Sequence, residues 1–370
     1  MEQSALKKTH LYNTHLSLGG RMVEFGGWDM PVLYSSIIKE HKSVRASAGL
    51  FDISHMGEFL FEGPDAKKFL NIILTNDLSQ LKSGQGQYTL LCQDNGGVID
   101  DLYAYRLEED RFLLVVNASR IEIDWMWIRS QRNANYKSLE LEMTDISDNY
   151  SAMALQGPNS SKILSFLFPE ILTLQKNNIS QISFNNEAIW ASRTGYTGEL
   201  GFELYVKNEN ALDLWNSLFS LGIDLKPIGL AARNTLRLEK GFCLYGNDID
   251  ESTSPLEANL GWITKLNTKF INSEFLTNQK SSGLERKLVG FEVLDRGIAR
   301  TGYEVYCSNN NRIGVVTSGS MSPSLNKAIG LAYVNTKHII IGNNILILSL
   351  IHISEPTRLR RISYAVFCLK

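Results

Sequence analysis

Cysteine is scarce in this sequence, and the usual motifs of nucleotide and metal sites are missing. The four cysteines among its 370 residues, Cys92, Cys243, Cys307 and Cys368, lie far apart and form no CxxC pair. This spacing excludes a disulfide framework and a cysteine zinc site, and it fits a reducing compartment. The six histidines show no metal-ligand spacing, so we expect no metal. The absence of GxxxxGK and GxGxxG motifs leaves the common nucleotide sites without support.

An excess of charge of one sign is also lacking. The formal net charge is −2, from 37 basic and 39 acidic residues, whereas a general nucleic-acid binder needs a basic face. No apolar run reaches the ~20 residues of a membrane span. The first ten residues also lack the apolar stretch of a signal peptide. We therefore expect a cytoplasmic protein with neither nucleic acid nor membrane as a partner.

The chain is long enough for two or three domains. A polar stretch over residues 272–287, which lacks strong periodicity, predicts a domain boundary. The short strands and turns that follow it predict a small β-barrel. We expect an N-terminal α+β domain over residues 1–275 and the barrel over residues 285–349. Residues 350–370 concentrate arginine and resemble translated adapter DNA, and we interpret them as a non-native tail.

Two similar segments predict an internal duplication within the N-terminal domain. The segment FLFEGPDAKKFL, which begins at Phe59, is echoed by MALQGPNSSKIL, which begins at Met153. Gly63 and Gly157 permit a sharp exit from a strand, and the proline after each suits the first turn of a helix. The pattern predicts two related strand–turn–helix units.

Hydrophobic patterns also predict the elements around the most polar motifs. Residues 111–117 predict a buried strand, and a helix is expected from about residue 121 with Ser119 as its N-cap. Residues 187–207 predict two strands joined by a glycine-rich turn, and residues 230–240 predict a helix.

Seven short motifs then carry a resemblance to one family. In order they read RMVEFGGWDMPVLY, FDISHMGE, GGVIDDL, SRTGYTGE, GLAARNTLRLE, LYGNDIDE and MSPSL with IGLAYV, and they span about residues 6–335. The set resembles the T-proteins of the glycine cleavage system. The resemblance implies an α+β fold of three subdomains in a cloverleaf, with two related ferredoxin-like units and a small C-terminal β-barrel.

The same resemblance implies an aminomethyltransferase. Its donor would be an aminomethyl-dihydrolipoyl carrier, the H-protein, bound transiently. Its acceptor would be tetrahydrofolate, with release of ammonia and formation of 5,10-methylenetetrahydrofolate. Catalysis would fall to Asp101, the second aspartate of GGVIDDL, because a carboxylate can stabilise iminium-like charge or move a proton. Asp100 is interpreted as a cap of its Gly-Gly turn, a common role of aspartate.

A folate site is implied as well. Glu203 would accept two N–H donors of a pterin edge, and Tyr196 would line the site. Arg233 would hold a folate carboxylate or order Asp101, and the sequence leaves both open. Arg237, one turn later, is interpreted as a solvated charge that could pair with nearby acids. The resemblance implies further residues that line the folate site, and most of them are of types that usually pack in cores. They are Met56, Leu60, Tyr88, Val116, Asn117 and Trp262.

Two alternative functions share this resemblance. A folate-dependent demethylating domain of the dimethylglycine or sarcosine oxidase type is usually joined to a flavin-binding domain, and no dinucleotide motif is present here. A non-catalytic folate-binding factor for RNA modification or iron–sulfur assembly carries a Lys-Gly-Cys-Tyr-type motif where residues 240–243 read KGFC. The intact DD and GYTGE motifs favour the transferase.

Overall fold

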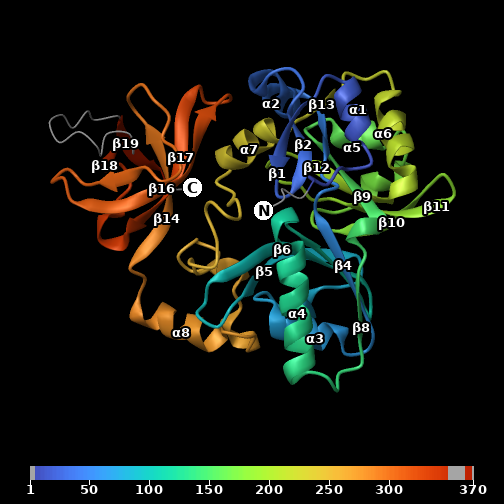
Figure 1. The fold of residues 1–370 in the computed structure, drawn as a ribbon, viewed down its shortest axis with the longest axis horizontal. Coiled ribbons are helices and arrows are strands. Elements are labelled where there is room, and N and C mark those ends of the chain that lie inside the picture. The colour runs from blue at the N-terminus through green and yellow to red at the C-terminus, as the bar shows by residue number, and fades with distance from the viewer. Residues whose placement is uncertain (1–4, 349–362, 369–370) are drawn as a thin grey trace. The chain divides into compact units, whose positions relative to one another are not determined.

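The computed structural model describes residues 5–348 and 363–368, and Figure 1 shows its ribbon. Two compact units make up the chain. The first comprises residues up to Leu91 together with Asp100–Arg233, and the second comprises Cys92–Ile99 with the residues from Asn234 onward. The polar stretch before the barrel is not irregular, because it contains helix α8 (Ser273–Ser282).

Two sheets with the same strand order form the first unit. Their strands are β3 (Gly49–Asp52), β4 (Gly57–Glu62), β5 (Gln85–Cys92), β6 (Val98–Glu108), β7 (Arg111–Val116), β8 (Glu142–Asp145), β9 (Tyr150–Gln156), β10 (Ile179–Phe184), β11 (Glu187–Ser192), β12 (Gly201–Lys207) and β13 (Lys226–Pro227). One sheet has the order β5-β6-β7-β4-β8, and the other has the order β10-β11-β12-β9-β3-β13. Apart from the inserted β3 the two orders match, which confirms the two related α+β units.

The helices and a small hairpin complete the first unit. They are α1 (Tyr12–Ser17), β1 (Arg21–Phe25), β2 (Trp28–Leu33), α2 (Ile37–Ala46), α3 (Ala66–Ile73), α4 (Ile121–Asn135), α5 (Ser160–Leu164), α6 (Ala211–Phe219) and the start of α7 (Leu230–Glu239). Helix α4 begins where predicted, but its N-cap residue is Arg120 and not Ser119. Ser119 lies inside the preceding 3₁₀ turn, η2 (Ala118–Arg120), so it cannot occupy the cap.

The Gly-Pro echo forms the same turn twice. Gly63 follows β4 with φ +127° and Gly157 follows β9 with φ +132°, a backbone region that favours glycine. A Cβ atom would lie 2.7 Å from the carbonyl oxygen of Glu140 in the first turn and 2.4 Å from that of Ser47 in the second. Helices α3 and α5 begin after these turns. Both prolines therefore precede the helices, and the prediction that they occupy the first helical turn is wrong.

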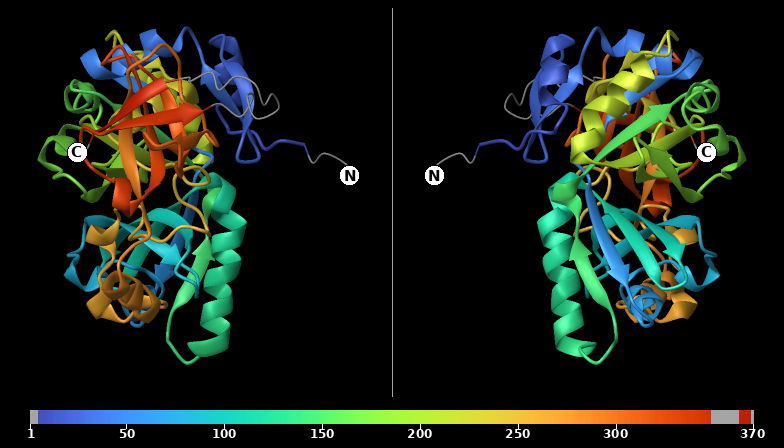
Figure 2. Two further views of the ribbon diagram at one scale, coloured as in Figure 1. Left: turned by 90° about the vertical axis from the view of Figure 1, so that its left-hand side faces the viewer. Right: turned by 90° about the vertical axis from the view of Figure 1, so that its right-hand side faces the viewer.

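The side chains of strand β4 point alternately to the two faces of its sheet, and helices cover one of these faces. The ring of Phe59 lies 4.9 Å from Trp125 of α4, and that of Phe61 lies 6.5 Å from Phe69 of α3. Both helices therefore cover the same side, and α4 is seen lying along this sheet in Figure 2. Because neighbouring side chains on a strand point to opposite faces, Leu60 points away from the helices.

The second unit carries a closed β-barrel, as the sequence predicts. Its strand order is β14-β17-β16-β15-β18-β19. The bounds are β14 (Arg286–Val293), β15 (Glu304–Tyr306), β16 (Arg312–Ser322), β17 (Lys327–Asn335), β18 (Asn344–Leu348) and β19 (Ser363–Cys368). Strand β19 pairs with β14 and β18. It belongs to the segment 350–370, whose non-native origin stays a prediction, and the rest of that segment lies outside the described residues.

Arg237 of α7 is not the solvated charge that the sequence predicts, but it does pair with an acid as the sequence allows. Its side chain is 1% exposed. Its guanidinium donates to the Asp248 carboxylate at 2.6 Å and to the Ser318 hydroxyl at 2.9 Å. Asp248 also accepts hydrogen bonds from the Leu244 N–H and the Thr317 hydroxyl. The buried ion pair therefore ties α7 to β16 within the second unit.

Within the two described ranges, no helix combines the length and the apolar character that crossing a membrane requires.

Candidate functional site

Asp101 lies on β6 and is held by two donors. The Tyr88 hydroxyl donates to its Oδ2 at 2.7 Å, and the Asn117 Nδ2 donates to its Oδ1 at 2.9 Å. Tyr88 comes from the neighbouring strand β5, and Asn117 directly follows β7 on the other side. Three residues predicted from the sequence therefore meet at the same carboxylate, which is half-buried.

The surroundings of Asp101 act on its pKa in opposite directions. Burial raises the pKa, whereas the hydrogen bonds from Tyr88 and Asn117 and the charge of Arg233 lower it. A carboxylate that has lost water but is fixed by two donors is suited to stabilise positive charge that develops beside it.

Asp100 is not the turn cap that the sequence predicts. It is 0% exposed, and its carboxylate accepts the backbone N–H of Asn117 at 3.0 Å and the side-chain amide of Asn117 at 2.9 Å. The Gly-Gly turn is capped instead by Asn95, whose Oδ1 accepts the N–H of Gly97 at 2.9 Å. The alternation along β6 explains the difference, because Asp100 points to the face covered by α4 and Asp101 to the opposite face.

The charge of Arg233 acts on both Asp101 and Glu203. Its guanidinium carbon lies 4.3 Å from the centre of the Tyr196 ring, which is a cation–π arrangement. Its charge lowers the pKa of Asp101 and that of Glu203. Burial and the charge of Arg233 together lower the pKa of His55 to about 4. His55 is therefore neutral at pH 7 and leaves the positive charge to Arg233.

Glu203 lies on β12 within a chain of hydroxyl groups. The Thr194 hydroxyl donates to its Oε2 at 2.6 Å, and the Tyr205 hydroxyl reaches the same oxygen at 3.3 Å. Thr194 is also hydrogen-bonded to Tyr105 of β6 at 2.9 Å, which links the two sheets. Burial raises the pKa of Glu203, and Thr194 and Arg233 lower it. Both protein donors use Oε2, so Oε1 can accept a donor from a ligand.

The remaining predicted lining residues lie in different places. Met56 is half-buried and Leu60 is 8% exposed, and Leu60 shares the face of Asp101. Val116 pairs with Gly57 on β4. This register puts its side chain on the helix-covered face, fully buried in the core. Trp262 belongs to the second unit, in η6 (Gly261–Ile263), and is 63% exposed.

Two residues of the site were not predicted from the sequence. Thr194 stands in the SRTGYTGE motif, so the motif itself was the available signal. Asp124 lies in the first turn of α4, where an acidic residue usually complements the helix dipole. No pattern in the sequence shows that Asp124 is 0% exposed.

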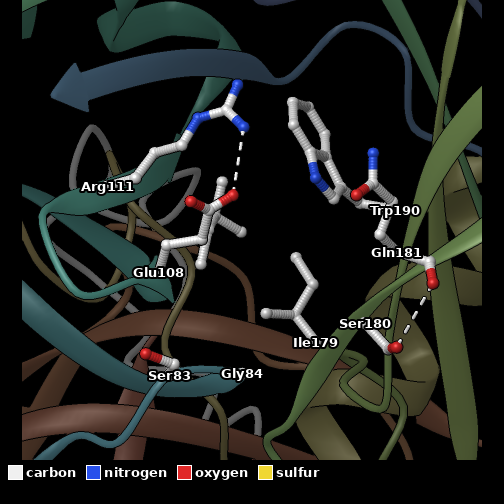
Figure 3. A pocket seen from close by; sticks show the side chains of 9 residues that line it. Ser83, Gly84, Glu108, Arg111, Ile179, Ser180, Gln181 and Trp190 are labelled. Carbon is white, nitrogen blue, oxygen red and sulfur yellow. Dashed lines mark hydrogen bonds and ion pairs between the residues drawn. The ribbon is translucent and has the colours of Figure 1, made fainter.

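A separate cavity of about 310 Å³ lies between the two sheets of the first unit, at β7, β10 and β11 (Figure 3). Arg111 and Glu108 form an ion pair of 3.6 Å at its wall, opposite Trp190. Its lining includes none of the predicted site residues, so it is distinct from the Asp101 cluster. The lining residues are Ser83, Gly84, Leu107, Glu108, Arg111, Ile179, Ser180, Gln181 and Trp190.

Two family models match the chain. The model described as the GCVT N-terminal domain matches residues 11–268, and the model described as the glycine cleavage T-protein C-terminal barrel domain matches residues 286–349. The second match coincides with most of the barrel described above.

Several similar proteins are described as aminomethyltransferases. The aminomethyltransferase of Halothermothrix orenii is 51% identical over 346 residues, which cover 92% of this chain and 95% of the relative. That of Flavobacterium psychrophilum is 46% identical over 350 residues, with coverage of 92% and 95%. The crystal structure of glycine cleavage system aminomethyltransferase T from Bartonella henselae matches with a TM-score of 0.89 at 33% identity. It covers 99% of this chain and 97% of that one.

Proposed function

This chain belongs to the glycine cleavage T-protein family of aminomethyltransferases, and we propose that tetrahydrofolate is its acceptor and a lipoylated H-protein its donor. The reaction would move the methylene of aminomethyl-dihydrolipoyl to tetrahydrofolate, with release of ammonia and formation of 5,10-methylenetetrahydrofolate. The observation that carries this proposal is the pair of carboxylates, Asp101 and Glu203, whose pKa values burial raises and the charge of one arginine, Arg233, partly lowers again.

The residues around Glu203 fit a pterin. Glu203 Oε1 can accept an N–H donor while Oε2 stays bound to Thr194 and Tyr205. A flat ring system needs aromatic and aliphatic walls, and the Tyr196 ring together with Leu60 and Met56 offers them. Tetrahydrofolate, when bound, supplies the amine nitrogens that take up the methylene.

Asp101 would act on charge and on the proton. Tyr88 and Asn117 hold both of its oxygens, so the carboxylate need not reorganise when positive charge develops on the aminomethyl group. It can also accept a proton from an attacking amine. We infer that Arg233 orders the site and keeps Asp101 and Glu203 ionised, in preference to binding a folate carboxylate. The rest of the rate enhancement would come from proximity and orientation.

The direct test measures ammonia released from an aminomethylated lipoyl carrier, with and without tetrahydrofolate. We expect release to be stimulated by tetrahydrofolate, and we expect none from a carrier whose lipoyl group lacks the aminomethyl group. Folate binding without stimulated release would contradict the transferase proposal. That outcome would favour the non-catalytic folate-binding factor.

Glu203→Gln should weaken tetrahydrofolate binding by roughly 10- to 100-fold, because a hydrogen bond to a charged group contributes about 1.5–3 kcal/mol. Isothermal titration calorimetry would measure the dissociation constant. The matched control is Glu187→Gln on β11, which loses an exposed ion pair of 3.4 Å with Lys207. It should change the constant by less than about threefold. Equal effects in the two variants would remove Glu203 from the folate site.

A further inference from the structure

A second pair of carboxylates lies on the helix-covered side of β6, directly beneath Asp101. Asp100 and Asp124 are both 0% exposed, and a hydrogen-bonding interaction between their side chains lowers the pKa of Asp100 and raises that of Asp124. No N–H or hydroxyl group in the described part of the chain is hydrogen-bonded to either carboxylate oxygen of Asp124.

Such a contact requires a proton. Two ionised carboxylates are acceptors only and cannot hydrogen-bond to each other. Burial and the charge of Asp101 raise the pKa of Asp100 to about 7, and burial with the charge of Asp100 raises that of Asp124 well above its ordinary value. Like charges in a buried site favour protonation of one partner.

The local charges lead to the same result. The carboxylates of both pairs, Asp101 with Glu203 and Asp100 with Asp124, meet the positive charges of two arginines. Arg120 acts on Asp124, and Arg233 acts on Asp101. Negative charge would therefore exceed positive charge among groups that have lost contact with water, which is costly, and a proton on the Asp100–Asp124 pair reduces the excess. A bound cation is not the alternative, because no group of metal-binding side chains among the described residues is arranged to hold one.

The hydrogen bonds decide which residue carries this proton. Asp100 Oδ2 accepts the backbone N–H of Asn117, and Oδ1 accepts its side-chain amide. Both oxygens of Asp100 therefore act as acceptors, and the contact lowers the pKa of Asp100 but raises that of Asp124, so we assign the proton to Asp124. The same amide nitrogen of Asn117 donates to Asp101 Oδ1 at 2.9 Å. A continuous series of hydrogen bonds thus runs from Asp124 through Asp100 and Asn117 to Asp101.

We propose that Asp124 is a positioning residue that holds one proton against Asp100 and, through Asn117, fixes Asp101 for aminomethyl transfer. The catalytic part of this inference rests on the proposed function. The shared proton itself does not.

The pH dependence of kcat separates positioning from packing. Asp124→Asn keeps a donor to Asp100 and should stay within about threefold of the wild type near neutral pH. Asp124→Ala removes the donor, so Asp100 takes up the proton and can no longer accept both N–H groups of Asn117. We expect kcat of this variant to fall roughly 10- to 100-fold at acidic pH. The difference in kcat between this variant and the wild type should become smaller as the pH rises, because Asp100 is then ionised again. A deficit that is constant with pH, or equal in both variants, would overturn the proposal.

Infrared spectroscopy of the unliganded protein tests the proton without any activity. The wild type should show a carboxylic-acid carbonyl band that Asp124→Asn lacks. The control is Glu58→Gln, which removes another buried acid, 1% exposed, whose pKa burial also raises; this variant should keep the Asp124 band. Absence of that band in the wild type would overturn the shared proton. An inactive wild type that shows the band would contradict only the proposed function and the catalytic role that rests on it.

Discussion

Asp101→Asn should lower the rate constant of aminomethyl transfer by about 10²- to 10⁴-fold, the range that a positioned acid–base group contributes. The substitution keeps the shape of the side chain and removes its charge. An amide has one acceptor oxygen, so it cannot satisfy Tyr88 and Asn117 together as the carboxylate does. Single-turnover ammonia release at saturating tetrahydrofolate would measure the chemical step directly.

Asp110→Asn is the matched control for this experiment. It makes the same chemical change in the turn after β6, where the side chain is exposed, and it should leave the rate unchanged. Tyr88→Phe removes one donor but keeps the charge of Asp101, so its loss should be smaller, roughly 10-fold. If Asp101→Asn binds tetrahydrofolate and turns over within threefold of the wild type, Asp101 is not the reacting carboxylate.

Arg237→Met should destabilise the second unit by about 3–5 kcal/mol, because it leaves the Asp248 carboxylate buried without its counter-charge. Arg237 and Asp248 are 1% and 0% exposed. A chain of two compact units need not unfold in one transition. Native-state hydrogen exchange of the β16 and β17 amides therefore measures the stability of the barrel more directly than a single melting temperature does.

Two further variants test whether the unpaired charge of Asp248 causes the loss of stability in Arg237→Met. Arg312→Met breaks an exposed ion pair with Glu304 in the same barrel, 60% exposed on the arginine side, and should cost less than about 1 kcal/mol. Arg237→Met with Asp248→Asn removes the stranded charge but keeps an acceptor for the Leu244 N–H. The double variant should be more stable than Arg237→Met alone. An equal or lower stability would show that packing, and not the buried charge, dominates.

The sequence predicted the elements whose signals are local. The hairpin of β11 and β12 follows from two alternating strands around a glycine-rich turn, and the duplication follows from the two Gly-Pro segments. The class of fold and the barrel were predicted for the same reason, because strand patterns and turn residues lie within a few positions of each other.

Burial of single polar side chains could not be predicted in this way. Arg237 looks like any helical arginine until Asp248 and Ser318, which are distant along the chain, close around it. Asp100 and Asp101 are adjacent in sequence, and only the packing of α4 on one side of β6 separates their environments. The motifs located Asp101, Glu203 and Arg233, but which hydrogen bonds they make depends on strands that come together only in the fold.

Under the proposed function, the duplicated architecture of the first unit divides the chemistry between its two copies. Asp101 comes from β6 of the first copy and Glu203 from β12 of the second, and the charge of one arginine acts on both. An ancestral single module could have assembled this pair only by meeting another copy of itself, as in a two-fold homodimer. Fusion of the two modules makes their stoichiometry permanent. It also frees each copy to diverge, so that in the proposed function one copy supplies the reacting carboxylate and the other the folate-binding one.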